Sequence, residues 1–162
     1  MAASWVLAIV AAILIFGLVA LAWRPVRAKI RENELTRARR DFHRHREHLE
    51  AKFMRLASGS GKPRGLEWVR CDFEDDVLYA RHRQSGELSA FVGVTIGFEA
   101  VEGGGMEDVE AVGNLRAATA VFRVERGNWA TDGRALFNLN PAEAIAYYQE
   151  NLELVGQELA AR

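Results

Sequence analysis

Cys71 and His82 are the residues whose types best fit a nucleophile and its general base. We predict that residues 66–73 and 77–83 form a hairpin on either side of an acidic turn. In the register expected for that hairpin, Cys71 and His82 lie on opposite faces. No third group is in place to orient the base, so the pattern favours a buried, unreactive cysteine.

Two other stretches resemble ligand sites but each lacks essential parts. FHRHREH (42–48) carries two pairs of metal-ligand types at helical spacing. Neither pair has a third ligand, and the arginines between them would repel a cation. GSGKP (59–63) lacks the earlier glycine and the Ser or Thr after lysine that a phosphate loop needs. We therefore predict no catalytic residue, no metal ligand and no cofactor.

The segment 99–115 is acidic and contains three consecutive glycines: Gly103, Gly104 and Gly105. Consecutive glycines have high conformational freedom. We interpret the segment as a mobile connection between two long strands. The alternative is a flap over the sheet or a contact loop for a partner, in which Arg116 and Arg134 would pair with its acids.

Residues 5–23 are nineteen residues without a charge and begin and end with tryptophan. A helix of this length spans roughly 28 Å, close to the thickness of a bilayer core. Tryptophan favours the membrane interface. We predict a transmembrane anchor over residues 1–23. Ala20-Leu21-Ala22 resembles a signal-peptide cleavage site, but positive charge follows the apolar run instead of preceding it.

A basic stretch follows the apolar one. Residues 24–46 hold nine Lys or Arg against three acids. Basic residues beside a span favour the cytoplasmic side, which predicts an outside N-terminus and a cytoplasmic C-terminal domain. Only three of 21 basic residues are Lys, and with the many alanines this suggests a bacterial protein of the plasma (inner) membrane. Four residues are candidates for contact with anionic headgroups, the alternative being a solvated face: Arg24, Arg27, Lys29 and Arg31.

Residues 26–57 read as one long helix. Leu35, Phe42, Leu49 and Leu56 recur every seven residues, which is half of a heptad seam. One interpretation is a homodimer through this helix. The other, slightly favoured, is that Phe42, Leu49, Phe53 and Leu56 pack the distal half on the following domain. Nucleic-acid binding is not expected, because aromatic stacking residues and recognised motifs are missing.

The rest of the chain predicts an α+β fold. Residues 88–98 alternate between apolar and small or polar side chains, the clearest strand pattern present. Residues 115–126 and 129–139 continue an antiparallel meander of four or five strands, with a turn or bulge at Asp132-Gly133. Asn140 is a good helix N-cap, and an apolar stripe from Ile145 to Leu159 predicts a C-terminal helix packed on the sheet.

These elements predict four regions: an anchor (1–23), a basic juxtamembrane helix (24–57), a hinge (58–65) and an α+β domain (66–162). The missing catalytic pattern favours a single-pass membrane protein whose domain is an interaction or assembly module for an unknown protein partner. The alternative is a ligand-binding or enzymatic domain with the 99–115 segment as its lid.

Overall fold

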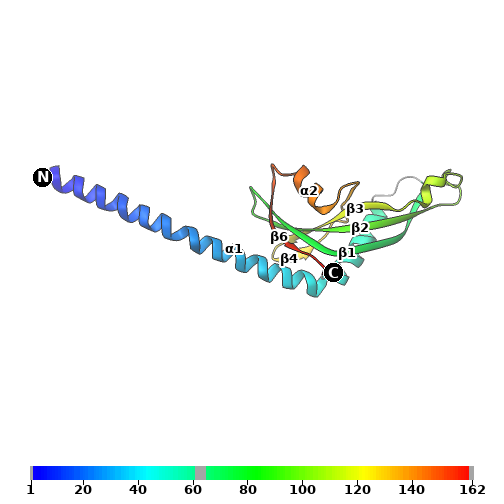
Figure 1. The fold of residues 1–162 in the computed structure, drawn as a ribbon, viewed down its shortest axis with the longest axis horizontal. Helices are drawn as coiled ribbons and strands as arrows, with labels where there is room; N and C mark the ends of the chain where they lie inside the picture. Colours follow the sequence, from blue (N-terminus) through cyan, green and yellow to red (C-terminus); the bar gives the residue numbers. More distant parts are fainter. Residues whose placement is uncertain (1, 61–64, 161–162) are drawn as a thin grey trace. The chain divides into compact units, whose positions relative to one another are not determined.

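The fold is α+β, as expected, and a computed structural model describes residues 2–60 and 65–160 (Figure 1). A six-stranded antiparallel sheet has the order β4-β3-β2-β1-β6, with β5 pairing along the same strand, β3, as β4. The elements in chain order are α1 (Ala2–Ser60), β1 (Leu66–His82), β2 (Leu88–Ala100), the 3-10 helix η1 (Glu110–Gly113), β3 (Arg116–Glu125), β4 (Asn128–Ala130), β5 (Ala135–Phe137), α2 (Pro141–Tyr147) and β6 (Leu152–Glu158).

The chain divides into two compact units, Met1–Asp41 and Phe42–Arg162, and the boundary falls inside α1. Residues 42–60 of the helix therefore belong to the same unit as the sheet. Of the predicted hinge, residues 58–60 are helical, and residues 61–64 lie outside the described residues. Among the helices of the described residues, none meets the length and apolar character that crossing a membrane requires.

The predicted hairpin at residues 66–83 is wrong, because β1 is one strand of 17 residues. The acidic residues occupy a bulge between Phe73 and Val77, where the register with β2 shifts. Arg46 of α1 donates hydrogen bonds to the backbone carbonyls of Glu74 and Asp75. The acidic residues of this bulge resemble the sequence of a turn, and the helix that stabilises the bulge is distant in the chain. The local sequence therefore predicts a turn where the strand continues.

The predicted C-terminal helix is wrong beyond Tyr147. Asn140 does cap α2, with both bonds of a capping box formed to Glu143. The chain then turns and enters β6, which pairs antiparallel with the edge of β1, for example Leu78 with Gln157. The unpaired edge of β1 supplies backbone partners that an isolated helix prediction ignores. This strand raises the total above the four or five expected.

Residues 42–60 of α1 cover one face of the sheet, here called the α1 face. Phe42 and Phe53 are fully buried there, and their rings lie 5.4 Å and 5.9 Å from that of Phe122. The predicted packing is confirmed for these two and for Leu49, which is 3% exposed, while Leu56 is only half-buried.

Gly133 is the point where α1 crosses the broken edge strand formed by β4 and β5. A Cβ atom on Gly133 would lie 2.6 Å from the backbone nitrogen of Ala57, and the residue has a φ of +76°. The strand break expected at Asp132-Gly133 is present, and it lets the helix backbone approach the sheet closely.

The opposite face, here called the α2 face, carries a smaller core. Ala144 and Ile145 of α2 pack over four residues of β1, β2 and β3: Leu78, Ala80, Phe91 and Val121. In Figure 1, α2 and residues 42–60 of α1 lie on opposite sides of the sheet.

Candidate functional site

The segment after β2 is a defined turn docked against the start of β1. The Val101 N–H donates to the Gly65 carbonyl at 2.8 Å, and the Gly104 N–H donates to the Val101 carbonyl at 2.8 Å. A Cβ on Gly104 would lie 2.7 Å from the Cα atom of Gly65. Gly104 therefore allows two backbone segments to touch.

The neighbouring glycines meet a different requirement. Gly103 and Gly105 have φ values of +77° and +73°, a region that glycine enters without strain. The Glu107 carboxylate accepts a hydrogen bond from the Gly103 N–H. Backbone hydrogen bonds from Glu107 itself and from Gly103 lower the pKa of this carboxyl. Each glycine of the run thus has a structural role: Gly104 permits a close backbone contact, and Gly103 and Gly105 adopt positive φ values.

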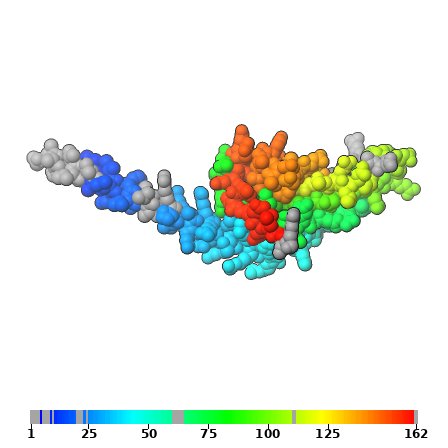
Figure 2. Space-filling model, viewed as in Figure 1, coloured from blue at the N-terminus to red at the C-terminus, as the bar shows by residue number. Residues whose placement is uncertain are grey.

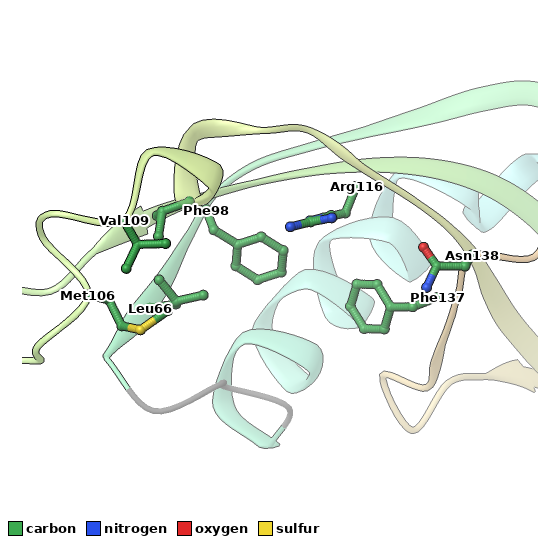
Figure 3. Close-up of a pocket in the computed structure, with 8 residues that line it drawn as sticks. Leu66, Phe98, Met106, Val109, Arg116, Phe137 and Asn138 are labelled. Carbon is green, nitrogen blue, oxygen red and sulfur yellow. The ribbon is translucent and has the colours of Figure 1, made fainter.

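A cavity of about 320 Å³ lies between this segment and the α1 face (Figure 3). Apart from Arg116 and Asn138, its lining is apolar: Leu66, Phe98, Met106, Val109, Val112 and Phe137. Trp68 packs against two of these residues, with ring centroids 5.6 Å from Phe98 and 6.3 Å from Phe137. Its indole Nε1 is buried without a hydrogen-bond partner among the described residues.

Arg116 and Arg134, predicted to act together with the acidic segment, lie on opposite faces of the sheet. Arg116 is opposite Ile96 on the α1 face. Arg134 precedes by two residues Leu136, which packs in the α2-face core. Among the side chains that the structure describes, which exclude that of Glu110, neither guanidinium forms an ion pair with the acids of the segment. The two arginines line separate hollows, and that of Arg134 measures about 310 Å³.

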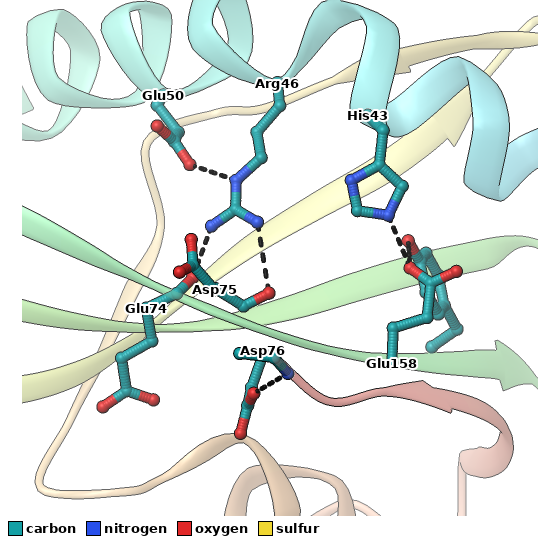
Figure 4. Close-up of polar contacts among 9 residues, drawn as sticks. His43, Arg46, Glu50, Glu74, Asp75, Asp76 and Glu158 are labelled. Carbon is teal, nitrogen blue, oxygen red and sulfur yellow. Dashed lines mark hydrogen bonds and ion pairs between the residues drawn. The ribbon is translucent and has the colours of Figure 1, made fainter. Parts of the chain in front are cut away.

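A polar cluster joins α1, β1 and β6 (Figure 4). His43 Nε2 lies 2.6 Å from Glu158 Oε2, which also accepts a hydrogen bond from the Tyr79 hydroxyl at 2.9 Å. Arg46 pairs with Glu50 at 2.6 Å while holding the bulge of β1. Figure 2 shows the C-terminal strand (red) beside the cyan part of α1, residues 42–60. These contacts fasten residues 42–60 of α1 to the sheet. The described residues contain no group of three metal-ligating side chains.

Cys71 and His82 do not form a catalytic pair. Both belong to β1, where Cys71 lies opposite Ile96 and His82 lies opposite Leu152. Burial raises the pKa of the Cys71 thiol to about 12, with smaller contributions from the charges of Asp72 and Glu50. The thiolate required of a nucleophile is therefore disfavoured, which agrees with the unreactive cysteine that the sequence favoured.

The basic residues proposed to contact lipid lie on the first unit of the chain. The Arg27 guanidinium carbon lies 5.5 Å from the centre of the Trp23 ring. Arg27, Lys29 and Arg31 are exposed, and the side chain of Arg24 lies outside the described residues. Their exposure leaves the charges available to an anionic surface.

No family model, curated protein or solved structure matches this chain. A function has to be argued from the site alone. Sequence reasoning singled out Gly103 to Gly105, Arg116 and Arg134, but it missed Trp68 as a buried donor, Gly65 as the partner of Gly104, and the hollow beside Arg134. These features depend on which strands pair, and no local signal in the sequence contains that information.

Proposed function

We propose that this is a single-pass bacterial plasma-membrane protein with its N-terminus outside and a non-enzymatic binding domain in the cytoplasm. The anchor is supported by the nineteen uncharged residues 5–23. Within that stretch Ile13, Phe16 and Leu18 are 65%, 76% and 67% exposed. Large apolar side chains left uncovered by the chain itself are stabilised in an apolar surrounding such as a bilayer core.

Lipid headgroups are the second proposed contact of the first unit. The exposed Arg27, Lys29 and Arg31 follow the apolar stretch directly, and Arg24 adjoins it in sequence. Each basic side chain near an anionic surface is worth about 1 kcal/mol. A homodimer through residues 26–57 is not part of the proposal, because Phe42 and Phe53 pack on the sheet.

The observation that carries the binding role is an apolar surface at the end of the sheet near the 101–115 segment. It consists of Val69 and Leu115, which are 49% and 57% exposed, and it is here called the distal apolar surface. A Cβ on Gly97 would lie 3.5 Å from Leu115 and 3.8 Å from Val69, so these two side chains meet over Gly97. Clustered exposed apolar side chains mark interaction sites, and we assign this one to an apolar segment of a partner protein.

Site-specific photo-crosslinking in cells tests the partner. A photoreactive residue at Leu115 is expected to give one discrete adduct, and Val69→Asp, which changes the side chain that meets Leu115 over Gly97, is expected to abolish it. The control position is Tyr147, which is 72% exposed on α2. The same adduct pattern from both positions, or no adduct from Leu115, would contradict the proposal.

Protease treatment of spheroplasts tests the anchor and its orientation. A C-terminal tag should fractionate with membranes and stay protected until the cells are permeabilised. A tag cleaved in intact spheroplasts, or recovered in the soluble fraction, would overturn this part alone.

A small ligand beneath the 101–115 segment is the second candidate function. It is favoured by the mostly apolar lining, by Arg116, which has no partner among the described residues, and by the buried indole N–H of Trp68, whose ring packs on the lining residues Phe98 and Phe137. Met106→Trp, which fills the cavity, separates the two functions. If this variant no longer binds an anilinonaphthalene sulfonate dye but still gives the Leu115 adduct, the cavity is a ligand site in addition to the partner surface. If the variant loses the Leu115 adduct but still binds the dye, the result favours the partner-binding function.

A further inference from the structure

The hollow on the α2 face has the features of a second binding site. It measures about 310 Å³ and lies between α2, the start of β6 and the β1–β2 end of the sheet. Its apolar lining includes Phe91, Val121 and Leu136, and its polar lining includes Ser89 and Arg134. It shares no lining residue with the cavity under the 101–115 segment.

Ser89 is the first observation that points to a ligand. Its side chain is only 7% exposed, and it lines the hollow. The two buried threonines are satisfied, because Thr119 donates to the Leu139 carbonyl at 2.7 Å and Thr131 donates to the Val121 carbonyl at 3.1 Å. In the described part of the chain the Ser89 hydroxyl has no such partner. A hydroxyl that lines a hollow and has no partner within the chain can donate a hydrogen bond to a molecule bound there.

The charge around the hollow is the second observation. Arg123 is paired with the Asp132 carboxylate, and the one lining acid, Glu87, accepts a hydrogen bond from the Ser85 hydroxyl at 3.0 Å. The Arg134 guanidinium has no partner among the described residues, and Arg134 bonds to Asp132 only through its backbone N–H. A free guanidinium and a hydroxyl that line the same hollow suit a carboxylate, which can accept two hydrogen bonds from an arginine.

We propose that this hollow binds a small carboxylate with an apolar body, such as an aryl or short alkyl acid. Arg134 and Ser89 hold the carboxylate, and Phe91, Val121 and Leu136 pack against the apolar part. The His82 ring also faces the hollow, and its Nδ1 accepts from the Ser85 N–H at 3.2 Å, which leaves the ring proton on Nε2. The site is independent of the distal apolar surface and of the partner proposed there.

Titration of phenylacetate into the full chain, held in nanodiscs of zwitterionic lipid, tests the proposal. Saturable binding is expected by calorimetry after subtraction of empty nanodiscs. The neutral isostere phenylacetamide should bind about tenfold more weakly, because it cannot pair with a guanidinium. Arg134→Gln should weaken phenylacetate binding about tenfold and Ser89→Ala about threefold.

Arg126→Gln is the matched control, since Arg126 is exposed and lines neither cavity. It should leave phenylacetate binding unchanged. No saturable binding, equal binding of acid and amide, or an equal loss in Arg126→Gln and Arg134→Gln would each overturn the proposal. Arg134 is exposed, so an unchanged circular dichroism spectrum shows that the variant is folded. None of these variants should change the Leu115 adduct, so failure of this proposal is distinguishable from failure of the proposed partner binding.

Discussion

The two faces of the sheet are covered to different extents. On the α1 face the rings of Phe42 and Phe53 are fully buried, and that of Phe42 lies 5.0 Å from Trp129. On the α2 face a seven-residue helix contributes Ala144 and Ile145 to a small core and leaves a hollow of about 310 Å³ beside it. A long helix with aromatic side chains can fill the part of a sheet face that lies beneath it, whereas a short helix leaves room beside it that a ligand can use. We therefore expect stability to depend mainly on the α1 face and small-ligand binding on the α2 face.

The largest effect is expected where the α1 face is most tightly packed. Phe53→Ala removes a fully buried ring that contacts Phe73 and Phe122, which should lower the free energy of unfolding by about 3–5 kcal/mol. The measurement is urea unfolding of the full chain in mild detergent, followed by circular dichroism. Met54→Ala, 40% exposed, is the control and should cost less than about 0.5 kcal/mol. Equal losses would show that the helix does not pack on the sheet.

A somewhat smaller loss is expected where the backbone of α1 touches the edge strand. Gly133→Ala adds a Cβ against Ala57 at a φ of +76°, and strain plus overpacking should destabilise the fold by about 2–4 kcal/mol. Gly127→Ala separates these causes, because Gly127 has a φ of +83° with nothing within 4 Å of the added atom. If both variants lose the same stability in urea, the close helix contact is absent.

On the α2 face the matching truncation should cost less. Ile145→Ala removes a 7% exposed side chain and should lower the unfolding free energy by about 2 kcal/mol, at the low end for such changes, because the adjoining hollow reduces its packing. Tyr147→Ala, at 72% exposure, should be nearly neutral. An Ile145→Ala loss as large as that of Phe53→Ala would contradict the difference between the faces.

The smallest effect concerns the half-buried thiol of the α1 face. The pKa of Cys71 is about 12 in the folded chain against an ordinary value of 9.0. Since the unfolded thiol ionises first, stability contributed by the neutral thiol is present below pH 9.0 and is lost as the pH rises towards 12. Iodoacetamide should alkylate Cys71 much more slowly in the folded chain than in urea. Cys71→Ala should flatten the alkaline fall in stability, and rapid alkylation of folded protein would contradict the raised pKa.

The elements that the sequence predicted correctly are those set by local patterns. The period-two alternation of residues 88–98 falls within β2, and the capping box at Asn140 begins α2. The spacing of Phe42, Leu49 and Phe53 placed one side of α1 in the core. The failures, β1 and β6, are segments whose backbone partners lie far away in the chain.

For the candidate site, too, the sequence indicated residue types, and the tertiary structure decided which residues lie together. Sequence reasoning named Arg116 and Arg134 from their type, but only the strand register shows that they lie on opposite faces. Shifting a strand by one residue reverses the face of every side chain, and the register is fixed by hydrogen bonds between distant segments. No local pattern could therefore have shown that Ser89 and Arg134 line one hollow.

The sequence by itself determined the helical character of α1, the strand character of β2, and the placement of apolar and basic residues along the first unit. These follow from periodicity, capping and charge, which act over a few neighbouring residues. Only the tertiary structure decided that β1 runs unbroken through its acidic bulge, that the chain ends in a strand, and that each glycine of the 103–105 run has a fixed role. The reason is that Arg46, the free edge of β1 and Gly65 supply contacts that are distant in sequence and close only after folding.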